Sequence, residues 1–238
     1  MQTVFAALAT VVVVIAALAA HAEQSANPSF DCDKARTQDE HAICADSRLA
    51  ELDQALSIAY NQAEHKSRDE SREVARDALA ARHSCAGDRL CILDQQVNAI
   101  TVFANLGSKV PVPPWVGSYR VELFKHRAAR PFATLPHQIG QCAVTKIASI
   151  STRFGEELKP EQGDGTAVTF ANGGLQISYN YEPDVAKSRI GDEVLLCLVS
   201  VPKDCPPGDD RGKIYSATNL TTVGSWLLPD AQHSCGGA

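Results

Sequence analysis

The chain is 238 residues long, 45% of its residues are hydrophobic, and its formal net charge is −6 at pH 7. The charge divides unevenly: residues 23–106 hold 9 Lys and Arg against 15 Asp and Glu, whereas residues 107–238 hold 13 of each. An acidic surface on the first segment repels nucleic acid and attracts a basic protein, so we expect no nucleic-acid partner. A solvated helical exterior is the alternative explanation of the same charges.

The first residues indicate export. Residues 4–20 form an apolar run that ends in Ala20, His21 and Ala22, a small-x-small pattern typical of a signal peptidase site. We expect residues 1–22 to be removed, which places the mature chain in the periplasm or outside the cell. An uncleaved membrane anchor is the alternative, because the run approaches the length of a short spanning helix and carries no Lys or Arg before it.

Two helix starts follow in the sequence. Thr37 and Glu40 have the spacing of a capping box, which predicts a short helix over about 37–45. Asp46 is a second candidate N-cap, for a longer helix that reaches about residue 66. Apolar residues recur along this second helix at steps of three and four, namely Leu49, Leu52, Leu56, Ala59 and Ala63. They define one buried face.

Two further helices are expected from residues 69–85 and 90–104. The first is charged and rich in Ala, so its apolar stripe is weak, whereas the second carries a stronger amphipathic pattern. Short connections between these helices predict an antiparallel helical hairpin or small bundle over residues 23–106.

The string from Asp31 to Tyr60 resembles the opening of the lysozyme-inhibitor LprI-like family. The residues that carry the resemblance are Asp31, Cys32, Lys34, Ala35, Thr37, Glu40, Ile43, Cys44, Ala45, Asp46, Leu49, Ala50, Leu52, Asp53, Leu56 and Tyr60. An Arg-x-x-Cys element, Arg82 to Cys85, and then Cys91 also fit the family pattern. The chain departs from it at Ala78 and Leu79, where relatives often carry a bulky aromatic, so we expect a thinner core there. The resemblance covers residues 30–105 and implies binding and inhibition of lysozyme.

The cysteines indicate disulfides in an oxidising compartment. All eight lie after the signal segment, four in the helical part and four in the remainder: Cys32, Cys44, Cys85, Cys91, Cys142, Cys197, Cys205 and Cys235. Four cysteines allow three pairings in each part, and short loop closure favours Cys32 with Cys44 and Cys85 with Cys91. A metal site is the rival interpretation, but no Cys-x-x-Cys pair is present, so we expect no metal.

The second half changes character. Residues 107–116 are rich in proline and predict a stiff linker. After it, short β-branched and aromatic segments between turn signals predict strands at 119–124, 143–151, 166–170, 176–181, 193–201, 213–218 and 225–228. We therefore expect an α+β chain of two domains, in which residues 117–238 form an antiparallel β sandwich or barrel.

Two segments of this half contain residue types that are found in functional sites. The acidic pair in the turn 205–212 has the oxygen ligands of a Ca²⁺ site, but a braced turn in which Arg211 pairs with a carboxylate fits better. Asp230, His233 and Ser234 are the residue types of a hydrolase triad, but they are crowded together without a nucleophile elbow.

The two tryptophans, Trp115 and Trp226, have the rings that stack on sugars, yet core packing is the simpler expectation. We therefore expect neither an enzyme nor a cofactor.

The sequence thus predicts an exported protein that binds lysozyme, or another basic protein, and inhibits lysozyme by occluding its active-site cleft. The residues expected to contact the partner are the acidic positions near the first two helices: Asp39, Glu51 and Asp53. The alternative function is a disulfide-braced envelope adapter that binds another protein or the cell wall. Contact with a membrane is expected only if the signal segment stays uncleaved.

Overall fold

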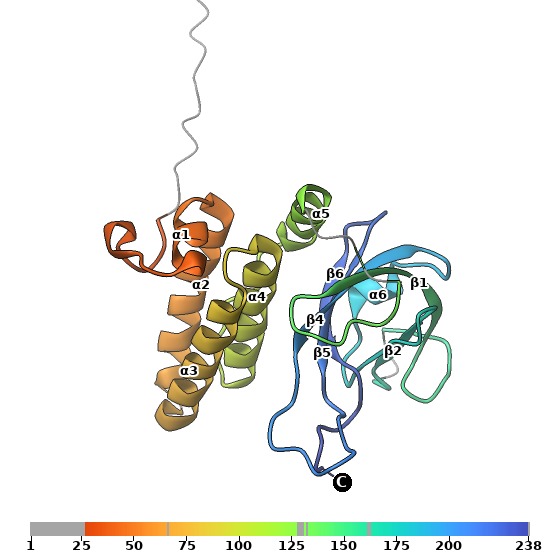
Figure 1. Ribbon diagram of the computed structural model, residues 1–238. Helices are drawn as coiled ribbons and strands as arrows, with labels where there is room; N and C mark the ends of the chain where they lie inside the picture. Colours follow the sequence, from red (N-terminus) through yellow and green to blue (C-terminus); the bar gives the residue numbers. More distant parts are fainter. Residues whose placement is uncertain (1–26, 66, 128–130, 132, 161–162, 238) are drawn as a thin grey trace, which may run out of the picture.

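A helical part and a sheet part lie side by side in the protein (Figure 1). The structure, a computed structural model, describes residues 27–65, 67–127, 131, 133–160 and 163–237. The predicted α+β organisation is confirmed. The expected signal segment, residues 1–22, lies outside the described residues. Among the described helices, none is both long enough and apolar enough to cross a bilayer.

The helical part holds a short 3₁₀ turn and five helices. In chain order they are η1 (Cys32–Lys34), α1 (Gln38–Cys44), α2 (Ser47–Glu64), α3 (Arg68–Ser84), α4 (Arg89–Asn105) and α5 (Val116–His126). The predicted N-cap Asp46 is confirmed, since its carboxylate accepts hydrogen bonds from the backbone N–H of Arg48 and Leu49. Glu40 accepts from the N–H of Thr37, as the capping box requires.

The sheet part is one curled antiparallel sheet of six strands, ordered β3-β2-β1-β4-β5-β6. Its elements are β1 (Cys142–Ser151), β2 (Thr166–Phe170), β3 (Leu175–Ser178), α6 (Pro183–Ala186), β4 (Glu193–Ser200), β5 (Ile214–Asn219) and β6 (Ser225–Pro229). Gln176 draws the two edge strands together: its Nε2 donates to the Leu228 carbonyl, and its Oε1 accepts from Trp226 Nε1 at 2.8 Å. The expected sandwich or barrel thus takes the form of a half-barrel.

All eight cysteines form disulfides. Cys32 pairs with Cys44 and Cys85 with Cys91, which confirms the pairing favoured by short loop closure. The other two bridges join Cys142 to Cys197, opposite each other on β1 and β4, and Cys205 to Cys235.

One predicted strand is wrong. Residues 119–124 belong to helix α5, and the buried side chains Val116, Tyr119, Arg120 and Leu123 follow the three-and-four spacing of one helical face. Tyr119, Val121 and Leu123 alternate as in a strand, but the burial of Val116 and Arg120 as well shows that the buried face is that of a helix. Gly117 lets α5 lie close to the sheet, since a Cβ there would be 2.0 Å from the carbonyl oxygen of Val223.

The two parts share buried contacts. One hydrophobic cluster joins the leucines of α2 and α4 to Leu195 and Cys197 on β4. The segment predicted as a linker lies along α2, where the Lys109 N–H and the Trp115 Nε1 donate to Gln62 and Glu51 at 2.8 and 3.1 Å. The helical part and the sheet part are therefore packed against each other.

Candidate functional site

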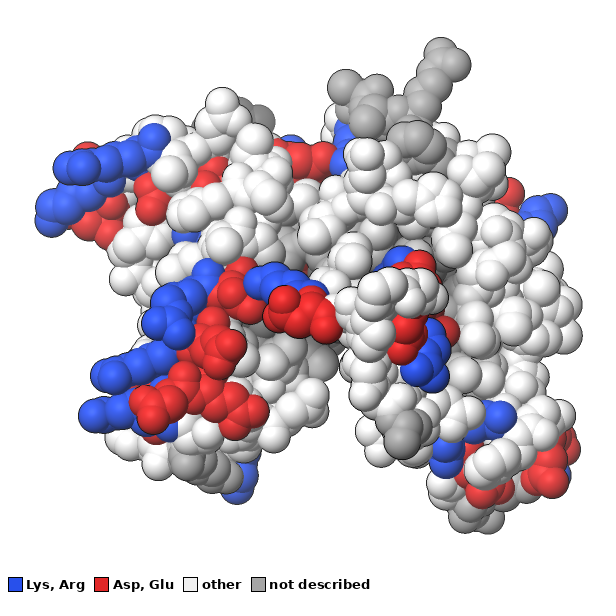
Figure 2. Space-filling view, turned by 60° about the horizontal axis from the view of Figure 1, so that its bottom comes forward, with Lys and Arg blue, Asp and Glu red and all other residues white. Residues whose placement is uncertain are grey.

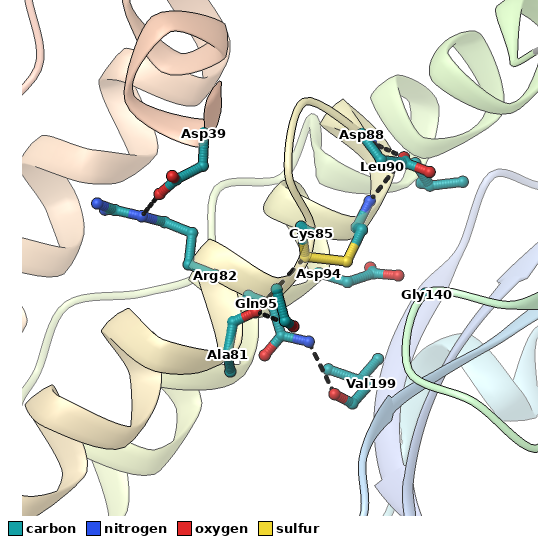
Figure 3. Close-up of a disulfide and its surroundings, with 12 residues drawn as sticks. Asp39, Ala81, Arg82, Cys85, Asp88, Leu90, Asp94, Gln95, Gly140 and Val199 are labelled. Atoms are coloured by element: carbon teal, nitrogen blue, oxygen red, sulfur yellow. Dashed lines mark hydrogen bonds and ion pairs between the residues drawn. A yellow bond between two sulfur atoms is a disulfide. The ribbon is translucent and has the colours of Figure 1, made fainter. Parts of the chain in front are cut away.

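Two of the three residues expected to contact a partner are buried. Asp39 and Asp53 are 1% and 4% exposed, and Arg82 on α3 lies between them. Arg82 donates from Nε to Asp39 Oδ2 at 2.7 Å and from Nη1 to Asp53 Oδ1 at 3.1 Å; Figure 3 shows the bond to Asp39. The expectation for these two aspartates is therefore corrected: they link α1, α2 and α3, and their carboxylates are not available at the surface.

The electrostatics of Asp39 fit this structural role. Burial by itself would raise the pKa of its carboxyl, but the side-chain donors Thr37, His83 and Arg82 outweigh burial and lower the pKa to about 2. The His83 ring nitrogen Nδ1 lies 2.9 Å from Asp39 Oδ1. The carboxylate is thus held in its charged form by three neighbours.

The third candidate, Glu51, does lie at the surface. Its carboxylate accepts the hydrogen bond from Trp115, whose ring also lies against Tyr119 and the guanidinium of Arg48. Trp115 is therefore occupied by packing and tethers the segment before α5.

The other candidate features of the second half have structural partners. Arg211 pairs with Asp209 through two hydrogen bonds of 2.8 and 2.9 Å, so the turn is braced in the expected way. Asp230 accepts from the N–H groups of Gly212 and Lys213. Within the described residues, no hydrogen bond or ion pair joins Asp230, His233 and Ser234 to one another.

Burial changes the charge balance of the helical part. Among the described residues of the range 23–106, four carboxylates, Asp39, Asp46, Asp53 and Asp94, and one cation, Arg82, are buried. When these five residues are left out, residues 23–106 hold 11 Asp and Glu against 8 Lys and Arg, an excess of three negative charges in place of six. What matters for a partner is where those remaining carboxylates gather.

A groove of about 440 Å³ runs between α3 and α4 on one side and the end of β4 on the other. Glu70, Glu73 and Asp77 form its acidic wall, one helical face of α3 at steps of three and four, and all three are exposed. Across the groove Lys203 reaches Asp77 at 2.9 Å. Figure 2 shows Asp and Glu side chains on the helical part, next to Lys and Arg side chains, near the hollow that separates it from the sheet part.

The remaining lining of this groove is largely apolar. Val102 comes from α4, Ile139 from the segment before β1, and Val199 and Val201 from the end of β4 and the residues after it. Ile139 and Val201 are 40% and 38% exposed, so the groove presents aliphatic surface to solvent. An acidic wall next to exposed aliphatic side chains suits a basic, partly apolar protein segment.

Buried polar contacts fix the two walls relative to each other. Gln95 on α4 donates from Nε2 to the Val199 carbonyl on β4 at 2.7 Å (Figure 3). Deeper in the junction, Asp94 accepts from Arg120 Nε at 2.6 Å and from Ser216 Oγ at 2.9 Å, which joins α4, α5 and β5. The groove is therefore held by contacts that are shielded from water.

The Cys85–Cys91 disulfide lies at the same junction. Gly140, with φ of +81°, approaches it so closely that a Cβ there would be 3.2 Å from Cys91 Sγ. Arg127 donates from Nη2 to the Gly140 carbonyl at 2.7 Å and from Nε to Asp88, the N-cap of α4, at 3.0 Å. The Cys85–Cys91 disulfide, which links the end of α3 to the start of α4, thus also contacts the segment that carries Ile139.

The acidic wall was not among the predicted contact residues. Its signal was present in the sequence, because Glu70, Glu73 and Asp77 recur at steps of three and four within the charged segment 69–85. Without the sheet beside it, this pattern is indistinguishable from an ordinary solvated helix face. Comparisons of the chain with known protein families, with curated proteins and with solved structures found no match. The resemblance to the LprI-like family therefore rests on the residues of this chain alone.

Proposed function

We propose that this protein binds a basic protein in the groove between α3 and the sheet, and that its partner is a lysozyme. The observation that carries the proposal is the acidic wall Glu70, Glu73 and Asp77 opposite exposed aliphatic side chains. The wall attracts a basic surface and speeds encounter, while the aliphatic side chains supply the apolar area that holds a bound segment. The resemblance of residues 31–60 to LprI-like inhibitors is what selects lysozymes, which are commonly basic, among possible partners.

Inhibition would work by occlusion. A lysozyme cleaves its glycan between two carboxyl groups in an open cleft, so a protein that covers the cleft stops the reaction without any chemistry of its own. In this proposal one basic lip of the enzyme's cleft enters the groove, and the exposed face of α3 lies across the cleft opening. The inhibitor needs a shaped, charged surface and no catalytic group.

The compartment agrees with such a role. Four disulfides favour an oxidising environment outside the cytoplasm. We place the protein in the periplasm or outside the cell, delivered by the signal segment, where it would protect the wall of its producer.

The direct test is hydrolysis of purified cell-wall glycan by a c-type lysozyme in the presence of the purified full chain at low salt. The proposal predicts dose-dependent inhibition at micromolar protein that weakens as salt is added, because the attraction is between exposed charges. Full hydrolysis at micromolar protein and low salt would refute it.

The alternative, an envelope adapter, uses the same groove with another partner. It is favoured by the sheet part, which supplies one wall of the groove and is larger than a helical inhibitor requires. Binding of a defined basic envelope protein, with no binding of lysozyme under the same conditions, would select this alternative. The full chain has to be used in both tests, since the helical part and the sheet part share buried contacts.

A further inference from the structure

A second cavity, of about 380 Å³, lies within the helical part. It is bordered by α1, α2, α3, α4 and the segment before η1, it opens to solvent on one side, and much of its lining is apolar: Phe30, Leu56, Ala75, Ala78, Leu79 and Phe103. Leu79 is 46% exposed, so one side of the cavity reaches the surface. The cavity therefore has both an apolar interior and an entrance.

The small side chains of α3 explain why this space is not filled. Ala75 and Ala78 present only methyl groups toward α2 and α4, where a well-packed helix pair would carry larger side chains. Tyr60 and Phe103, which also line the space, pack edge to face on each other with ring centroids 5.8 Å apart. The expected thinner core around Ala78 thus coincides with this cavity.

The charged groups that border the cavity already have hydrogen-bond partners within the protein. Arg82 is shared between Asp39 and Asp53, and Ser29 N–H also donates to Asp53 at 2.8 Å. Glu40 accepts hydrogen bonds from the backbone N–H groups of Arg36 and Thr37. An anionic ligand would meet Glu40 and Asp53 with Arg82 as the only cation of the described lining, and a charged ligand of either sign would lose its hydration in a mainly apolar space, so the lining favours a neutral molecule.

Two hydroxyl groups that line the cavity are available to a ligand. Within the part of the chain that the structure describes, the hydroxyls of Ser57 and Tyr60 make no hydrogen bond. Gln96 is 1% exposed; its Nε2 donates to the Leu49 carbonyl at 3.2 Å, and its Oε1 is buried without a donor. That oxygen has almost no accessible surface, so a ligand N–H or O–H would instead donate to the hydroxyl of Ser57 or Tyr60.

We propose that this cavity binds a neutral, mainly apolar small molecule that carries one N–H or O–H donor. Its volume lies in the range of about 300–1,000 Å³ usual for small-molecule sites. It also exceeds the engineered apolar cavity of about 150 Å³ that takes up benzene, so a fused-ring molecule is a suitable size. This site is separate from the proposed inhibition and does not depend on it.

The test uses the neutral fluorescent probe N-phenyl-1-naphthylamine, titrated into the purified full chain. We expect saturable binding with blue-shifted, enhanced emission at one site, and loss of at least tenfold in affinity in Ala75→Phe, which places a ring in the cavity. The control is Ala80→Phe, which adds the same ring on an exposed position of the same helix. No saturable binding to the wild type, or equal binding to both variants, would overturn the proposal.

Two further arms keep the result interpretable. If Ala75→Phe does not fold, as judged by its circular dichroism, Ala75→Leu fills the cavity with a smaller side chain and must weaken binding in the same direction. The donor is tested by displacing the probe with indole and with indene, which have nearly the same shape but differ in the N–H group. Stronger displacement by indole supports the assigned donor, and equal displacement contradicts it.

Discussion

The side-chain amide of Gln95 on α4 donates a hydrogen bond of 2.7 Å to the main-chain carbonyl of Val199 on β4. This bond crosses from the helical part to the sheet part at the groove, and Gln95 is buried. It ties the acidic wall of α3 and the aliphatic wall after β4 into one surface, because α3 packs on α4.

Replacing this donor should loosen the groove. Gln95→Leu leaves the Val199 carbonyl buried without its donor, and we expect the free energy of unfolding to fall by about 1–3 kcal/mol. Urea titration followed by circular dichroism measures the change, with Gln38→Leu on the exposed face of α1 as the control. Equal stability of Gln95→Leu and the wild type would show that the bond contributes nothing to the junction.

The bridge made by Arg82 should be among the most sensitive points of the helical part. Arg82→Met removes the cation between two buried carboxylates, and we expect a loss of about 3–5 kcal/mol in unfolding free energy. Arg76→Met, an exposed position on the same helix, should change it by less than about 0.5 kcal/mol. Similar losses in the two variants would contradict the assigned role.

The lowered pKa of Asp39 predicts how stability depends on pH. A carboxyl whose folded pKa of about 2 lies below its ordinary value of 3.8 stabilises the fold above pH 4, and this contribution is lost as the pH falls toward 2. The difference corresponds to about 2 kcal/mol. Asp39→Asn should be less stable at neutral pH and show a flatter profile between pH 4 and 2, whereas Glu122→Gln, at an exposed position of α5, should keep the wild-type slope. An unchanged slope in Asp39→Asn would refute the prediction.

The Asp94–Arg120 pair at the junction predicts a different pattern. Arg120→Met leaves Asp94 as an uncompensated buried charge, which should cost about 3–5 kcal/mol. The double variant Asp94→Leu with Arg120→Met removes both charges and should recover part of that loss, because apolar side chains tolerate the site better than a lone carboxylate. A double variant less stable than Arg120→Met alone would show that Asp94 stabilises the junction in another way.

Local chemistry was readable from the sequence where it depends on neighbours along the chain. The capping role of Asp46, the buried face of α2 and two of the disulfides follow from spacing alone. Asp39 and Asp53 were misread because their partner, Arg82, lies about thirty to forty residues away, and only packing of α3 on α1 and α2 shows that they are buried. The groove was missed for the same reason: one wall lies in α3 and the other follows β4.

The central claim is tested most directly by the dissociation constant for c-type lysozyme of two variants with the same net charge. Glu70→Lys with Glu73→Lys reverses two charges of the groove wall, whereas Glu122→Lys with Glu193→Lys reverses two exposed carboxylates outside the groove lining. We predict that the wild type binds at micromolar or tighter affinity, that the groove variant binds at least about tenfold more weakly, and that the control stays near the wild type. Equal affinities of the two variants, or no binding of the wild type, would contradict the account.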